Sequence, residues 1–220
     1  MPSRVAAGPT ANYYGAMNSR EVSLAVAVGV VTLLSVRTAQ AETISVGARL
    51  GYGVATGDTV KGSPLKDSAS GVIPLQIDAL YYLGLGFSVG AYGSYGILTG
   101  LSDTAESGTQ TRLGAQAQFV LPLPLLKPWV GAGIGYEWQG RKAKLNGTTT
   151  DVSASGLELF NIAAGVKFTA LPILSVGPYV QYQRATFTST EALGAKVDIP
   201  DANQAAHGYI QGGLRAELSF

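Results

Sequence analysis

Seven charged residues of this chain could act together, because each stands on the polar face of a segment in which polar and apolar residues alternate. They are Arg49, Asp78, Arg112, Glu137, Lys167, Arg215 and Glu217. If these polar faces enclose a common interior, the charges must pair there, since an isolated buried charge is strongly unfavourable. The set therefore predicts an internal network of salt bridges that fills the interior. The alternative is a gated path for ions along the same groups.

A compact basic cluster forms the second candidate site. It consists of Arg141, Lys142 and Lys144. These side chains could clamp phosphate groups as positive point charges. The alternative is an ordinary solvated loop that turns at Asn146-Gly147.

The remaining candidates for catalysis or metal binding are weak. His207 is the only histidine, and Gly208-Tyr209 after it identifies no nucleophile for it, so we expect a solvated loop histidine. Asp198 and Asp201 are poor evidence for a cation site. The chain has no Cys, which removes disulfides, thiolate metal sites and cysteine nucleophiles. We predict no catalytic residue, no metal and no cofactor.

Alternation with a period of two residues begins at Thr43 and predicts β-strands. In residues 43–54, every even-numbered residue is apolar and the odd-numbered ones are Thr, Ser, Gly or Arg. Strands are expected at 43–54, 72–83, 86–98, 110–121, 130–139, 157–169, 173–187 and 210–220. Proline cannot donate to a ladder, so we expect a strand to start after Pro74 and a bulge at Pro178. Eight antiparallel strands predict an all-β fold, an up-and-down barrel.

The connections between these strands alternate in length. Three are short, at 83–86, 122–127 and 170–172. The longer ones hold most of the charged residues and lie at 56–71, 99–109, 140–156 and 188–206. Short turns at one end and long loops at the other are typical of transmembrane β-barrels, whose long loops face the exterior.

The alternation alone also fits a soluble barrel that buries its apolar face. Three features favour the inverted, membrane arrangement. The polar face is rich in Gly, Ser and Gln, and the strands are long enough for a tilted membrane crossing. Aromatic residues of the apolar face also gather at the two strand ends, as two lipid–water interfaces select. The two groups are Phe87, Phe119, Phe168 and Phe220, and Tyr52, Tyr136, Trp138 and Tyr182.

The first 41 residues are typical of a secretory signal peptide. An apolar segment of 15 residues, Val22 to Val36, follows Arg20 and precedes Ala39-Gln40-Ala41. The small residues Ala39 and Ala41 fit the −3 and −1 positions of a cleavage site before Glu42. Met17 is an alternative start that gives a shorter basic leader. The predicted organisation is a signal peptide at 1–41 and one barrel at 42–220.

The charge balance of the predicted mature chain argues against nucleic-acid binding. Residues 42–220 hold 12 basic and 13 acidic residues, so no basic excess remains to attract a phosphate backbone.

Three short motifs resemble those of small bacterial outer-membrane β-barrel proteins of the OmpA/OmpX-like kind. They are Pro128–Tyr136 (PWVGAGIGY), Asn161–Phe168 (NIAAGVKF) and the terminal Leu218-Ser219-Phe220. The resemblance covers residues 43–220. Its terminal motif is similar to the signal that the barrel-assembly machinery reads, with Leu218 and Phe220 as its key residues, although Arg215 stands where many such signals have Gly.

The resemblance implies a monomeric integral protein of the bacterial outer membrane, in contact with outer-membrane lipids and lipopolysaccharide. A structural, adhesive or lipopolysaccharide-contacting role at the surface is the leading functional hypothesis. A narrow channel for ions or small solutes is the second, and an outer-membrane lipid-modifying enzyme is the third.

N-terminal sequencing of the protein purified from membranes tests the predicted leader. We expect the mature chain to begin at Glu42, because the small residues before it suit signal peptidase. Any other first residue would contradict this cleavage site.

Overall fold

The computed structural model describes residues 43–102, 105–121, 123, 126–145, 148–192 and 194–220. The predicted signal peptide, its cleavage residues Ala39, Ala41 and Glu42, and the alternative start at Met17 lie outside the described residues.

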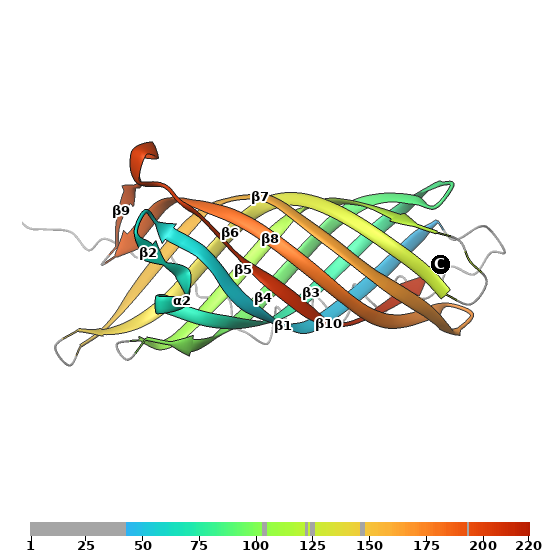
Figure 1. The fold of residues 1–220 in the computed structure, drawn as a ribbon, viewed down its shortest axis with the longest axis horizontal. Helices are drawn as coiled ribbons and strands as arrows, with labels where there is room; N and C mark the ends of the chain where they lie inside the picture. The colour runs from blue at the N-terminus through green and yellow to red at the C-terminus, as the bar shows by residue number, and fades with distance from the viewer. Residues whose placement is uncertain (1–42, 103–104, 122, 124–125, 146–147, 193) are drawn as a thin grey trace, which may run out of the picture. The chain divides into compact units, whose positions relative to one another are not determined.

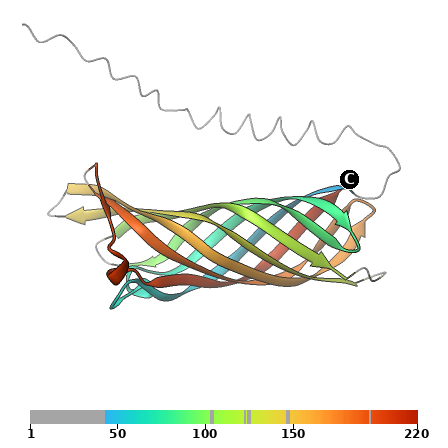
Figure 2. The same cartoon turned by 90° about the horizontal axis from the view of Figure 1, so that it is seen from above.

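Within the described residues, eight long antiparallel strands close into a barrel (Figures 1 and 2). They are β1 (Ile44–Val60), β3 (Ala69–Gly84), β4 (Phe87–Leu101), β5 (Ala105–Val120), β6 (Leu126–Leu145), β7 (Thr148–Leu171), β8 (Leu174–Ala192) and β10 (Ala206–Ser219). Each of these strands pairs with the next, and β10 pairs with both β8 and β1. The predicted eight-stranded up-and-down barrel is confirmed.

The two ends of the barrel differ (Figure 1). At the short-turn end, the Thr43 N–H donates to the Phe220 carbonyl oxygen at 2.7 Å. At the opposite, long-loop end lie four short elements: β2 (Ser63–Pro64), α2 (Leu65–Ser68), β9 (Ala195–Asp198) and the 3₁₀ turn η1 (Asp201–Asn203). There Leu65 of α2 packs into a small apolar cluster with Ala69, Val72 and Leu98.

The strands are longer than the sequence pattern predicts. They run from 14 residues in β10 to 24 in β7, so the expected loops at 99–109 and 140–156 are mostly strand. The reason is that backbone pairing continues after the apolar alternation has ended. In the β6–β7 hairpin, for example, Lys142 still lies opposite Asp151. The predicted loop boundaries were therefore wrong at the long-loop end.

Both expectations about the strand prolines were wrong. β3 begins at Ala69 and runs through Pro74, and the register between β7 and β8 is the same before and after Pro178. A proline lacks one N–H, so it removes a bond toward one neighbour only. The ladder pairs are interrupted opposite Pro74 on β1 and opposite Pro178 on β7, without an inserted residue.

A bulge does occur in β7, at Leu159-Phe160. Gly133 of β6 pairs with Asn161 and Gly135 pairs with Glu158, so two residues of β7 lie opposite one of β6. Because a bulge shifts the alternation by one residue, Asn161 and Glu158 both face the interior and are buried. The bulge is what turns Glu158 inward.

The outer face of the barrel is a belt of exposed aliphatic side chains, and the inner face is polar. Large side chains of the belt include Leu50, Leu75, Ile134, Val180 and Leu214. Aromatic side chains flank it, with Phe87 against Phe119 and Tyr136 against Trp138, each pair at 4.7 Å between ring centroids. Such a surface requires lipid or detergent around it and is unfavourable in water, which makes the barrel transmembrane. None of the described helices is long and apolar enough to cross a bilayer.

Substituting arginine at two equally exposed positions tests this assignment of the belt. Ile134 in the belt and Val197 in β9 are each 62% exposed. Arg at a lipid-facing position near the bilayer midplane costs about 2–4 kcal/mol, so I134R should lower the free energy of unfolding in lipid vesicles by about that amount. V197R should change it by less than about 0.5 kcal/mol. Equal effects of the two substitutions would contradict the assignment.

Candidate functional site

All seven charged residues expected on the polar face point into the barrel. They come from six strands, and none is more than 3% exposed. The local cause is the alternation itself, because a residue between two lipid-facing neighbours must face inward. An eight-stranded barrel is just wide enough for its side chains to fill it.

The Asp78 carboxylate is the centre of the network. Its Oδ2 accepts a hydrogen bond from Arg49 Nε at 2.7 Å and lies 3.7 Å from Arg215 Nη2. Its Oδ1 accepts hydrogen bonds from the side-chain amides of Gln76 and Gln116, at 2.8 and 2.9 Å. One anion thus links β1, β3, β5 and β10 across the interior.

The Arg49 guanidinium extends this centre to the far wall. Its Nη1 donates to Gln181 Oε1 at 3.0 Å, and its Nη2 donates to Gln116 Oε1 at 3.2 Å. Two guanidinium groups lie over the Trp129 ring. Arg49 Cζ is 5.1 Å from the ring centroid, and Arg215 Cζ is 4.6 Å from it. Cation–π contacts of this kind stabilise desolvated guanidinium groups.

Toward the short-turn end, Glu217 balances two cations. Its Oε1 accepts a hydrogen bond from Lys167 Nζ at 2.5 Å, and its Oε2 lies 2.5 Å from Arg215 Nη2. The Tyr82 hydroxyl donates to the same carboxylate at 3.1 Å. Arg215 also donates to the Gln118 side chain of β5.

Toward the long-loop end, Arg112 pairs with Glu158, a residue that sequence reasoning missed. Arg112 Nη1 lies 3.2 Å from Glu158 Oε1, and Asn161 Nδ2 donates to the same oxygen at 2.7 Å. Simple alternation counted back from Lys167 puts Glu158 on the lipid face, and only the bulge reverses it. The sequence did carry one signal, the negative charge of Glu158. A carboxylate is unfavourable in lipid, so its position among lipid-facing residues indicates that the alternation shifts nearby.

The expectation of a solvated loop histidine was wrong. His207 lies in β10, opposite Ala185 of β8, and is 1% exposed. Its Nε2 lies 3.4 Å from Glu137 Oε1, and its ring stacks on Phe187 with 4.0 Å between centroids. Gln183 Nε2 also donates to Glu137, at 3.1 Å.

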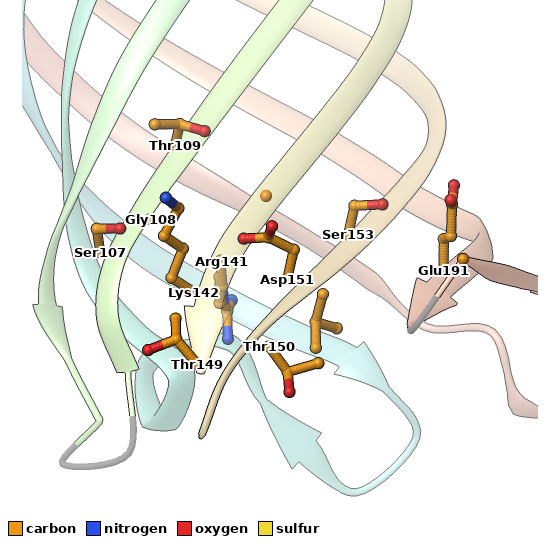
Figure 3. A pocket seen from close by; sticks show the side chains of 13 residues that line it. Ser107, Gly108, Thr109, Arg141, Lys142, Thr149, Thr150, Asp151, Ser153 and Glu191 are labelled. Atoms are coloured by element: carbon orange, nitrogen blue, oxygen red, sulfur yellow. The ribbon is translucent and has the colours of Figure 1, made fainter. Parts of the chain in front are cut away.

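Of the three basic residues of the second candidate site, the structure describes the side chains of Arg141 and Lys142. Arg141 turns into the barrel mouth, where its Nη2 donates to Gln139 Oε1 at 3.0 Å, whereas Lys142 is exposed. Lys144 lies in β6, but its side chain is outside the described part. Both Arg141 and Lys142 line a hollow of about 610 Å³ across the long-loop ends of β5, β6 and β7, together with Asp151 and Glu191 (Figure 3).

The two residues of the predicted assembly signal lie at the closing seam of the barrel. Leu218 pairs with Val46 of β1 and Leu174 of β8, and the Phe220 N–H donates to the Ile44 carbonyl oxygen at 2.9 Å. Across the described residues, no group of three or more His, Cys, Asp or Glu side chains could hold a metal ion.

Comparison with solved structures identifies the fold. Neisserial surface protein A aligns with a TM-score of 0.53 at 13% identity, over 80% of this chain and 97% of that protein. The outer membrane protein OprG from Pseudomonas aeruginosa aligns with a TM-score of 0.50 at 11% identity, over 81% and 97%. No protein-family model and no curated protein matches the sequence. The chain has the fold of small outer-membrane β-barrel proteins of the OmpA/OmpX-like kind, as its motifs predicted.

The Arg112–Glu158 pair is a direct test of the charged interior. E158Q leaves the Arg112 guanidinium buried without its anion, and breaking a buried pair in this way costs about 3–5 kcal/mol of stability. The matched control is E191Q, which removes the same charge from an exposed residue of β8 and should cost less than about 0.5 kcal/mol. Urea unfolding in detergent micelles measures both. A loss of stability no larger in E158Q than in E191Q would show that the pair does not hold the interior together.

Proposed function

We propose that this protein is an integral protein of the bacterial outer membrane whose interior is closed. In this proposal it acts at the cell surface as a structural, adhesive or lipopolysaccharide-contacting protein. The observation that carries the proposal is the network centred on Asp78, which joins opposite walls of the barrel through direct side-chain hydrogen bonds. A barrel filled in this way has no continuous water path for ions.

The hollows at the two ends support a closed interior. A hollow of about 160 Å³ at the short-turn end is lined by Lys167 and Glu217, and one of about 250 Å³ at the long-loop end is lined by Arg141 and Phe187. Between them lie the ion pairs Arg49–Asp78 and Arg112–Glu158, and these four side chains are almost completely buried. In this proposal the ion pairs separate the two hollows, so neither hollow continues through the barrel.

The long-loop end is the part suited to contacts outside the cell. Transmembrane barrels direct their longer connections outward and their short turns toward the periplasm. Binding functions concentrate in such segments on a rigid scaffold. The β6–β7 hairpin extends past Tyr136 and Trp138, and Lys142 and Asp151 on it are exposed. In this proposal these two residues face the lipid headgroups. Of the basic cluster Arg141, Lys142 and Lys144, Lys142 has an exposed side chain that could bind a lipopolysaccharide phosphate.

Two other functions are less well supported. A channel needs the internal charges to line a water path, but here each described cation of the interior below the mouth pairs with a carboxylate. A lipid-modifying enzyme needs its histidine at the lipid or water surface. His207 is instead enclosed between Phe187 and Glu137. We therefore propose a protein without catalytic activity.

Biogenesis is the remaining part of the proposal. The residues around Phe220 close the ring against β1, so Leu218 and Phe220 are placed where a signal for the barrel-assembly machinery would also seal the last strand. We further propose that the protein is a monomer that binds outer-membrane lipids and no nucleic acid.

Planar-bilayer recording tests the closed interior. The wild-type protein should insert without a steady single-channel conductance, and E137Q should behave in the same way. Heat-modifiable migration on a gel verifies that both proteins are folded before insertion. A steady conductance that changes with E137Q would overturn the closed interior in favour of an ion path.

A further inference from the structure

A small cavity at the long-loop end differs from the rest of the interior. This mouth cavity has a volume of about 250 Å³ and is lined by Val60, Gln139, Arg141, Val152, Phe187 and Ile199, with small and hydroxyl-bearing residues between them. Its walls are mostly apolar, although it opens at the polar end of the barrel. No acidic residue is among the described residues that line it.

Among the described residues that line this cavity, Arg141 is the one charge, and no described carboxylate forms an ion pair with it. Its Nη2 donates to Gln139 Oε1 at 3.0 Å, and no described carboxylate lies within 4 Å of its guanidinium. The cations deeper in the barrel are different, since Arg49, Arg112 and Lys167 each have a carboxylate within 3.2 Å. The remaining guanidinium donors of Arg141 are thus free to bind an anion.

The floor and the roof of the mouth cavity limit what can enter. Below it, Phe187 stacks on His207, and Gln139 Nε2 donates to the Tyr209 hydroxyl at 3.3 Å. At its outer side, the Ile199 N–H donates to the Thr188 carbonyl oxygen at 2.8 Å and the Lys61 N–H donates to the Asn203 carbonyl oxygen at 3.1 Å, so the last long connection is bonded to both β8 and the segment after β1. A ligand would be retained at the mouth and not passed down the barrel.

We propose that the mouth cavity binds a small monocarboxylate with an apolar body, with Arg141 as the carboxylate-binding residue. A guanidinium matches a carboxylate with two parallel hydrogen bonds, and one unpaired cation calls for one negative charge. The side chains of Val60, Val152, Phe187 and Ile199 would cover the apolar body of the ligand, as in small-molecule sites generally. The volume equals about eight water molecules at about 30 Å³ each, which suits a short or aromatic acid and is too small for a lipid.

Benzoate binding to the full-length mature protein in lipid nanodiscs tests this proposal. Saturation-transfer NMR should detect benzoate bound to the wild-type barrel. Benzamide has the same shape without the charge and should bind about tenfold more weakly, the scale expected for loss of a charge-assisted pair. R141Q should weaken benzoate binding by a similar factor. The matched control is K142Q, which removes the neighbouring exposed charge and should leave benzoate binding unchanged.

Three results would overturn the proposal. They are no binding of benzoate to the wild-type protein, equal binding of benzoate and benzamide, and an equal loss in K142Q and R141Q, which would indicate general surface charge. The benzamide comparison uses the wild-type protein, so it decides the question even if R141Q fails to fold. Binding is measured without reference to conductance, so this site and the closed interior can fail separately.

Discussion

The hydrogen-bonded ion pair between Arg49 and Asp78 is the interaction on which the interior depends. A ring of eight strands leaves no room for charges that keep their own hydration shells. Asp78 therefore receives its hydrogen bonds from Arg49, Gln76 and Gln116, with Arg215 nearby. Because these donors come from four strands, the pair also fixes the strands relative to one another. The side chains that fill the barrel therefore also hold its strands in position.

The alternation of side chains along each strand determines both the lipid-facing surface and the interior surface of the barrel. Each residue that faces the lipid sets its neighbours toward the interior, so the aliphatic belt and the charged network cannot be changed independently. β7 shows how strict this constraint is. Its bulge at Leu159-Phe160 keeps Leu157 and Leu159 exposed while turning Glu158 toward Arg112. The one extra residue of the bulge lets Glu158 face the interior while Leu157 and Leu159 beside it face the lipid.

Much of this fold could be predicted from the sequence, because alternation is a local property. The strand count, the polar interior and the inward direction of residues such as Arg49 and Glu137 follow from it directly. Glu158 and His207 could not be placed in this way. Glu158 depends on a bulge, and His207 depends on β10 continuing in strand pairing beyond the last clear alternation. The inward turn of Arg141 likewise depends on the extension of β6 beyond the aromatic residues.

The exchange rate of the Arg49 Nε–H with solvent tests the central claim most directly. Solution NMR in detergent micelles after transfer to D₂O can follow this proton, with the exposed Arg184 as the internal reference. A closed interior predicts that the Arg49 signal persists for minutes or longer, since exchange then requires the barrel to open, while the Arg184 signal disappears at once. Loss of both signals together would show that water reaches Asp78 and would contradict the account of a filled barrel.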